Sequence, residues 1–487
     1  MNDVIIDSTI GEASVGMTNI DIAATEGNLT LEKTSGKIIT DADVTMTGRN
    51  VRIQGVLRHT QGDGDGNTVE LLIAATNKAT LPTDIISQGT VKIEAGNSIE
   101  AYNGQILVQG TGEVLNISQT NTGGTIKFGR TILDGNGQYQ QQGLDLAAAS
   151  NVTVSGSKVD IGSGVRILSS ADNSTVNVSG DDINITGSLL AGGSLQENTV
   201  SWTGKAADVN LNATDVITFG GAGVENGKMV TRGGSAWATG NVNMNVAGGA
   251  KELDLSINEL SSIKSDATAR FAETGTLIFA DTSDSKINIT AQAQVEIDGL
   301  IQAYDDGSDI TIDSAGLLLI NGYIKADDTL TVDGGTNTQG YGLMLTPLIY
   351  RDSQQRLVNS SGFYINNQGE YVDEQSVKLA VGAAPVSSSE DVKNLARVSG
   401  GTLETAFGGN INISAEAGIV LSGQVSPFNS NGVNAEKITI ISENNAGDVF
   451  IDNAIGARSQ VIIKGRNLYL LDYQETERLN SVRPNNA

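Results

Sequence analysis

The sequence contains no cysteine, only one histidine and only five prolines in 487 residues. Without cysteine, and with His59 as the sole imidazole, disulfides, Ser-His-Asp triads and zinc sites built from His and Cys are excluded. Any catalysis would have to rest on carboxylates acting with Arg or Lys. No proline falls inside a run of alternating apolar residues, which is what hydrogen-bonded strands require.

Long hydrophobic runs and aromatic residues are also scarce. Aromatic residues make up 4% of the chain, so Val, Ile, Leu and Ala must fill the core, and the β-branched residues among them favour strands. No run approaches the roughly 18 apolar residues of a membrane-spanning helix. The first residues, MNDVIIDSTIGEAS, lack the basic and apolar regions of a signal peptide. We therefore expect the chain to be a piece of a longer protein.

Positive charge is sparse, with 30 Lys and Arg against 56 Asp and Glu, which gives a net charge of −26. Such a field disfavours nucleic acid and anionic membrane surfaces as partners. This net charge is typical of a soluble protein whose copies repel one another. The alternative interpretation is weak binding of cations, distributed over the surface.

A repeat of short apolar alternations organises the chain. Ile287 and Ile289 recur 23 residues later as Ile310 and Ile312. A period of this length is too short for a helical hairpin and fits a coil of short strands, with about 20–25 residues per coil. The alternation predicts inward side chains at Val44, Met46, Ile183, Ile185, Ile287, Ile289, Ile310, Ile312, Leu318, Ile320, Ile411 and Ile413.

A glycine closes most copies of the repeat, as at Gly299 and Gly322, and Asp or Asn commonly precedes it. We expect the glycine to supply a positive φ at the corner of each coil. The Asn and Asp residues tolerate left-handed backbone and can stack their side-chain amides from one coil to the next.

The rhythm breaks between residues 340 and 400, where short apolar runs recur every seven residues between turn-like SSG and NQG. This predicts a small β-rich protrusion outside the coils, and its tyrosines Tyr350, Tyr364 and Tyr371 are the predicted binding surface. Ser388-Ser389-Glu390-Asp391 resembles the start of a helix. A tolerated insertion without a role, or a cover for nearby coils, is the alternative.

A single loop resembles a metal site. Asp63, Asp65 and Asn67 follow the D-x-D-x-N spacing that opens a calcium-binding loop. Thr68 and Ala74 stand where such a loop has Gly and Glu, so a solvated turn is the alternative. Calcium at these three residues is the one candidate metal, and no other cofactor is expected.

The segments NITAQAQVEIDGLIQA, TIDSAGLLLINGYIKA and NISAEAGIVLSGQV resemble filamentous haemagglutinin-type repeats of very large bacterial exoproteins. The resemblance implies an all-β fold, a right-handed single-stranded parallel β-helix, with one insertion outside the helix. The expected domains are β-helix at 1–339, insertion at 340–400, β-helix at 401–472, and a polar tail or linker at 473–487. The family's Asn-Pro secretion motifs are not present, so the resemblance implies an internal segment.

The function that this resemblance implies is a structural or adhesive segment of a secreted or cell-surface bacterial protein, exported as part of a longer chain, and we expect it to be non-enzymatic. Expected partners are other protein chains or glycans, with self-association into fibres as a further expectation, and neither nucleic acid nor membrane insertion is expected. The alternatives are a polysaccharide-active β-helix enzyme and the stalk of a toxin-delivery protein. Three or more converging Asp, Glu, Arg or Lys side chains in one groove would favour the enzyme.

Overall fold

The structure is a computed structural model of the whole chain. It describes residues 3–10, 19–40, 42–59, 70–196, 199–202, 206–225, 227–246, 253–255, 277–354, 356–359, 362–366, 371–373, 375, 377, 379, 396–426, 434–443, 446–453 and 455–470. The chain divides into two compact units, Met1–Gly248 with Leu277–Ser285, and Gly249–Thr276 with Lys286–Ala487.

The described residues are all-β, and most strands pair in parallel. They contain no α-helix, and within them no helix is long or apolar enough to cross a membrane. The prediction of an all-β fold with parallel pairing is therefore confirmed.

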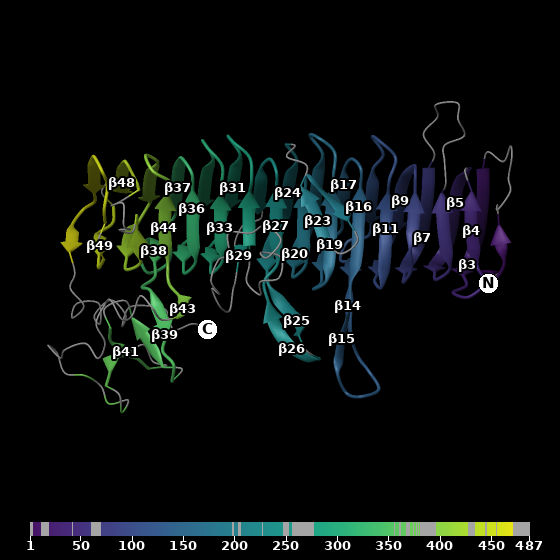
Figure 1. The fold of residues 1–487 in the computed structure, drawn as a ribbon, viewed down its shortest axis with the longest axis horizontal. Helices are drawn as coiled ribbons and strands as arrows, with labels where there is room; N and C mark the ends of the chain where they lie inside the picture. The colour runs from purple at the N-terminus through teal and green to yellow at the C-terminus, as the bar shows by residue number, and fades with distance from the viewer. Residues whose placement is uncertain are drawn as a thin grey trace. The chain divides into compact units, whose positions relative to one another are not determined.

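In the first unit, one large sheet carries two strand segments per repeat, which are joined into a single long strand in several repeats (Figure 1). Its strands are β1 Val4–Ile6, β3 Asn19–Leu31, β5 Asp43–Ile53, β7 Glu70–Leu81, β9 Thr90–Ala95, β10 Ser98–Ala101, β12 Leu115–Gln119, β13 Thr125–Phe128, β17 Val152–Ser155, β18 Lys158–Ile161, β20 Thr175–Ile185, β24 Asp208–Phe219 and β28 Val242–Val246.

A second parallel sheet of the first unit takes one strand from each repeat. Its strands are β2 Thr9–Ile10, β4 Lys37–Thr40, β6 Val56–His59, β8 Ile85–Ser87, β11 Gly104–Val108, β16 Leu144–Ala148, β19 Val165–Ser169, β21 Ser188–Ala191, β27 Ser235–Ala238 and β30 Leu277–Ala280.

The second unit follows the same plan. Its larger sheet contains β29 Leu253–Leu255, β31 Lys286–Ala291, β32 Val295–Ile297, β34 Asp309–Ser314, β35 Leu318–Ile320, β37 Thr329–Gly334, β38 Tyr341–Leu345, β45 Asn410–Ala415, β46 Gly418–Leu421, β48 Lys437–Ser442, β49 Val449–Ile451, β50 Gln460–Lys464 and β51 Leu468–Leu470. Its smaller sheet contains β33 Leu300–Ala303, β36 Tyr323–Ala326, β44 Thr402–Thr405 and β47 Gln424–Val425.

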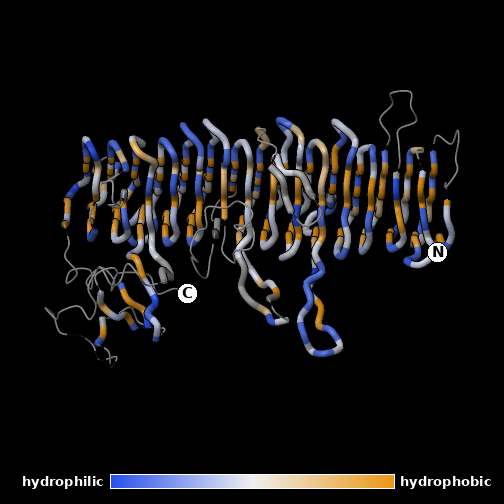
Figure 2. Tube along the Cα trace, in the orientation of Figure 1, coloured by the Kyte–Doolittle hydropathy of each residue, from blue (hydrophilic) through white to orange (hydrophobic). Residues whose placement is uncertain are grey.

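The pairing register follows the sequence repeat. Ile287 pairs with Ile310, Ile310 with Leu330, and Leu330 with Ile411, so the strand before the insertion pairs with the strand after it. All twelve predicted inward side chains are at most 1% exposed, as the alternation predicts. Figure 2 shows the same alternation of hydrophobic and hydrophilic residues along the stacked strands.

Most of the repeat glycines serve a different purpose from the predicted one. A Cβ at Gly55 would lie 2.1 Å from the carbonyl oxygen of Gly36, and a Cβ at Gly322 would lie 2.1 Å from that of Gly299. Neither glycine has a positive φ, although Gly164, at φ 77°, does. The expectation of left-handed corners is wrong for Gly55 and Gly322, where the missing side chain lets successive repeats approach closely.

Within the described residues, antiparallel excursions leave the stacked strands at four places. Figure 1 shows two of them, the hairpins β14–β15 and β25–β26, extending away from the sheets of the first unit. The hairpins are β14 Arg130–Leu133 with β15 Tyr139–Gln142, β22 Gly193–Gln196 with β23 Thr199–Trp202, and β25 Gly221–Glu225 with β26 Lys228–Arg232. The fourth is a five-stranded sheet in the second unit: β39 Ile349–Arg351, β40 Leu357–Asn359, β41 Tyr364–Ile365, β42 Tyr371–Val372 and β43 Ala396–Ser399.

Candidate functional site

One row of outward asparagines in the first unit forms bonds from repeat to repeat. Five asparagines at one bend form a ladder of four bonds, in which the amide nitrogen of every asparagine after the first donates to the amide oxygen of the preceding repeat, at 2.6–2.8 Å. They are Asn28, Asn50, Asn77, Asn97 and Asn121. The predicted stacking of amides from one repeat to the next is confirmed here, and these donors and acceptors are used within the ladder itself.

The bend also forms shallow grooves on the outside of the first unit. One of about 520 Å³ crosses β3, β5, β7 and β9, and another of about 440 Å³ crosses β17, β20 and β24. Both are lined mainly by Ala, Gly, Ser and Thr, with Glu94 and Asp181 as the only acidic side chains among their lining residues. Neither groove brings together the charged groups that hydrolysis of a polysaccharide needs.

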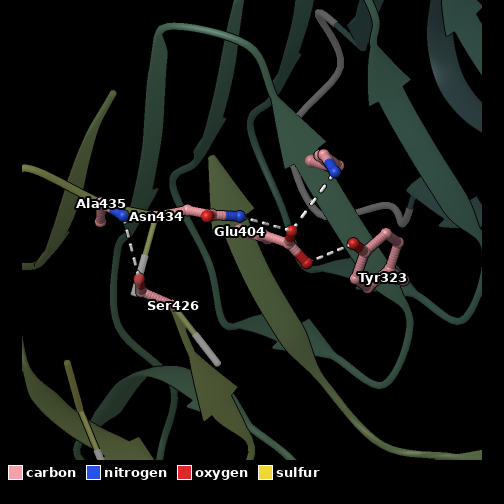
Figure 3. Close-up of polar contacts among 6 residues, drawn as sticks. Tyr323, Glu404, Ser426, Asn434 and Ala435 are labelled. Carbon is pink, nitrogen blue, oxygen red and sulfur yellow. Dashed lines mark hydrogen bonds and ion pairs between the residues drawn. The ribbon is translucent and has the colours of Figure 1, made fainter. Parts of the chain in front are cut away.

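In the second unit, Glu404 is the centre of the polar cluster drawn in Figure 3. Lys325 lies directly opposite it on β36, with Nζ 3.3 Å from Oε1, and the Asn434 amide donates to the same oxygen at 3.2 Å. The Tyr323 hydroxyl donates to the other carboxylate oxygen. The Glu404 side chain is only 13% exposed. A carboxylate with three donors around it holds neighbouring strands together and has little capacity left for a substrate.

A second acidic group lies on the larger sheet of that unit. Asp313 and Asp333 are register partners on β34 and β37, and the Ser414 hydroxyl donates to Asp333 at 2.8 Å. Partial burial raises the pKa of Asp313, and the charges of Asp333 and Glu416 raise it further. No three His, Cys, Asp or Glu side chains within the described residues are placed to hold a metal ion.

The predicted calcium residues Asp63, Asp65 and Asn67 lie outside the described residues, as does the predicted helix start at 388–391. The calcium site therefore stays a prediction. The side chain of His59 is also outside the described part, although its backbone pairs with that of Ser87.

The predicted tyrosines all lie on the five-stranded antiparallel sheet, but the structure gives them different places. Tyr364 is 6% exposed and packs with Val358 and Val372, so its ring belongs to the core of the insertion rather than to a contact surface. Tyr350 is half-buried against this cluster. The side chain of Tyr371 lies outside the described residues.

The Arg356 guanidinium packs over the face of the Tyr364 ring. Its guanidinium carbon lies 4.0 Å from the ring centroid, and its Nη2 donates to the tyrosine hydroxyl. The same guanidinium bonds Asp352 at 2.8 Å. Although burial acts to raise the pKa of Asp352, the hydrogen bonds from Arg356 and Gln354 outweigh it and leave the pKa lowered. The Tyr364 ring thus packs within the insertion and is held there by Arg356, while a binding surface at Tyr350, Tyr364 and Tyr371 stays a prediction.

The three hairpins of the first unit were not predicted. Leu133, Tyr139 and Met229 are exposed on them, and the Tyr139 amide donates to the Gly227 carbonyl at 3.0 Å, which joins two hairpins. Two of them carried a signal in the sequence, since Asn226-Gly227 and Asp134-Gly135 are dipeptides that favour hairpin turns. The hairpins were nevertheless missed because the strands beside these turns do not alternate apolar and polar residues.

Comparison of the chain with protein-family models, with curated proteins and with solved structures finds no match.

Proposed function

We propose that this chain is a non-enzymatic structural and adhesive segment of a very large secreted or cell-surface bacterial protein. In this proposal each unit is a length of right-handed, single-stranded parallel β-helix, which acts as a scaffold for the excursions. Its partners are other protein chains or glycans, and it is exported as part of a longer chain. The resemblance to filamentous haemagglutinin-type repeats gives the same expectation.

One observation carries the proposal: the outward polar groups of the stacked strands satisfy one another. The asparagine ladder of the first unit and the Lys325–Glu404 pair of the second use their donors and acceptors along the stack. A wall of this kind offers a similar surface at every repeat. Recognition of a specific partner then falls to the excursions, as it does in other proteins where loops are carried by a rigid framework.

The experiment concerns the five-stranded insertion. Tyr350 pairs with Arg397 across β39 and β43, so a Gly-Ser-Gly linker between Arg351 and Ala396 keeps this strand pair and removes the rest. Because Leu330 already pairs with Ile411, the stack does not need the removed residues. We expect the main unfolding transition, that of the stack, to be kept, and roughly tenfold weaker attachment of protein-coated beads to cultured epithelial cells.

The matched control replaces residues 222–231 of the β25–β26 hairpin with the same linker, and we expect it to leave attachment unchanged. Parent beads that do not attach at all would contradict the adhesive role. Attachment that survives loss of the insertion would assign binding to another part of the chain.

A further inference from the structure

The polar cluster around Glu404 brings an amine and a carboxamide to the same carboxylate oxygen. The Lys325 Nζ lies 3.3 Å from Oε1, and the Asn434 amide nitrogen lies 3.2 Å from the same atom. The Tyr323 hydroxyl donates to the second oxygen, so that Glu404 lies between Tyr323 and Asn434 (Figure 3). An amine and a carboxamide can condense into a new amide, and a carboxylate that bonds both can carry the proton between them.

Strand pairing holds Lys325 opposite Glu404. The two are register partners on β36 and β44 although 79 residues separate them, because the insertion leaves the stack between these strands. Their neighbours Ile324 and Leu403 are also register partners, and both are 0% exposed. The amine and the carboxylate therefore meet on a part of the stack that is fixed by its buried residues.

Backbone bonds on two sides hold Asn434 in place. The Gly408 amide donates to the Asn434 carbonyl at 2.9 Å, and the amide of the next residue, Ala435, donates to the Ser426 hydroxyl oxygen at 3.1 Å. Ala435 and Ser426 are both buried. The turn that carries Asn434 is thus anchored just after β44 and just after β47, with its carboxamide bonded to Glu404.

Partial burial of the cluster favours condensation over hydrolysis of the carboxamide. The side chains of Glu404 and Lys325 are 13% and 31% exposed, whereas those of Glu70 and Lys92, an ion pair of the first unit, are 41% and 38% exposed. Less water therefore competes with the amine for the amide carbon at the Glu404 cluster. Because the fold holds both reactants at one oxygen, the reaction also avoids the entropy cost of bringing them together.

We propose that Lys325 and Asn434 condense into an isopeptide bond within the chain, with Glu404 as the catalytic residue. Glu404 accepts a proton from the Lys325 ammonium group, and the neutral Nζ then attacks the Cγ of Asn434. The bond between Cγ and Nδ2 breaks as Glu404 returns the proton to Nδ2. The Nζ keeps a single hydrogen, and its other two leave with Nδ2 as an ammonium ion. Nothing is oxidised or reduced, and the reaction needs no co-reactant.

The bond lies where the chain leaves the stack for the insertion. It ties β36, which precedes the insertion, to the turn before β48, which follows it. A chain without cysteine has no disulfide for this purpose. Each chain reacts once and only with itself, so the inference adds a self-modification without making the protein an enzyme, and it does not depend on the adhesive role.

The first test is the intact mass of the purified full chain. We expect this mass to be lower than the mass calculated from the sequence by that of a single ammonia molecule. After digestion with trypsin, tandem mass spectrometry should find a branched peptide that joins Lys325 to Asn434, with no cleavage after Lys325. This peptide identifies both ends of the new bond.

Three substitutions each remove one part of the reaction. Lys325→Arg keeps the positive charge but removes the nucleophilic amine, Asn434→Ala removes the carboxamide, and Glu404→Gln removes the proton carrier. Each variant should have the mass calculated from its own sequence and give no branched peptide, while circular dichroism shows that it is folded. The control Glu70→Gln changes the other ion pair, in which Lys92 lies 2.8 Å from Glu70, and it should give the branched peptide in full.

A parent chain with the mass calculated from its sequence would overturn the inference. Loss of ammonia that persists in Lys325→Arg would overturn it as well, because it would mark a cyclic imide at an Asn-Gly pair such as Asn321-Gly322. A branched peptide that still forms in Glu404→Gln would overturn the catalytic role of Glu404.

Discussion

The stacked strands and the five-stranded insertion of the second unit bury their side chains in different ways. In the stack, each inward residue is covered by equivalents in the repeats on both sides, as Ile312 is by Ile289 and Val332. In the insertion, the described core is Val358, Tyr364 and Val372 with Tyr350 against it, and Arg356 lies over the Tyr364 ring. Stability is spread along the stack and concentrated in a few contacts in the insertion. We therefore expect the two regions to unfold separately.

The largest loss of stability is expected from a substitution at a glycine where successive repeats approach closely. Gly55→Ala would place a Cβ 2.1 Å from the Gly36 carbonyl and 2.5 Å from that of Glu32, both of them backbone atoms. Because neither can move without disturbing strand pairing, we expect the free energy of unfolding to fall by about 3–5 kcal/mol. Urea denaturation followed by circular dichroism measures it.

The control lies in an excursion of the same unit. Gly135, in the turn of the β14–β15 hairpin, has no atom within 4 Å of a Cβ. Gly135→Ala should change the free energy of unfolding by less than about 0.5 kcal/mol. Equal effects of the two substitutions would show that the glycines of the stack are not needed for close packing.

The second prediction tests whether the stacked strands and the insertion unfold independently. Ile312→Ala removes a side chain that is 0% exposed between two repeats, so we expect a loss of about 2–4 kcal/mol in the main unfolding transition. Val358→Ala, at an equally buried position of the insertion, should leave that transition in place and speed local opening instead. Hydrogen exchange read by mass spectrometry distinguishes the two. A single transition shifted equally by both variants would mean that the insertion and the stack form one cooperative body.

The inward positions were predictable because alternation is a local property: each strand shows which of its faces is buried. Gly55 and Gly322 were assigned the wrong role because the atoms that exclude a side chain there belong to the preceding repeat, which local pattern does not reveal. The packing of Tyr364 inside the insertion could not be predicted for a similar reason. Its burial depends on pairing among three antiparallel strands and on the position of Arg356, neither of which the seven-residue spacing contains.

The asparagine ladder could be predicted only in part. The sequence shows Asn at the corners, and the tendency of amides to stack between coils follows from their chemistry. Which asparagines meet depends on repeats of unequal length, since Asn50 and Asn77 are 27 residues apart whereas Asn77 and Asn97 are 20 apart. Only the strand register brings them into one line.

The smallest predicted effect concerns that ladder, and it tests whether the outer wall contributes to stability as the core does. The Asn77 amide donates to Asn50 at 2.6 Å and accepts from Asn97 at 2.8 Å. Asn77→Ala breaks both bonds, but the partners lie near the surface, where water can replace part of what is lost. We expect the free energy of unfolding to fall by about 1–2 kcal/mol. The control Asn136→Ala changes an exposed asparagine in the β14–β15 turn and should have no measurable effect. If both variants unfold like the parent chain, the ladder only accompanies the stacking, and the buried apolar rows alone hold successive repeats in register.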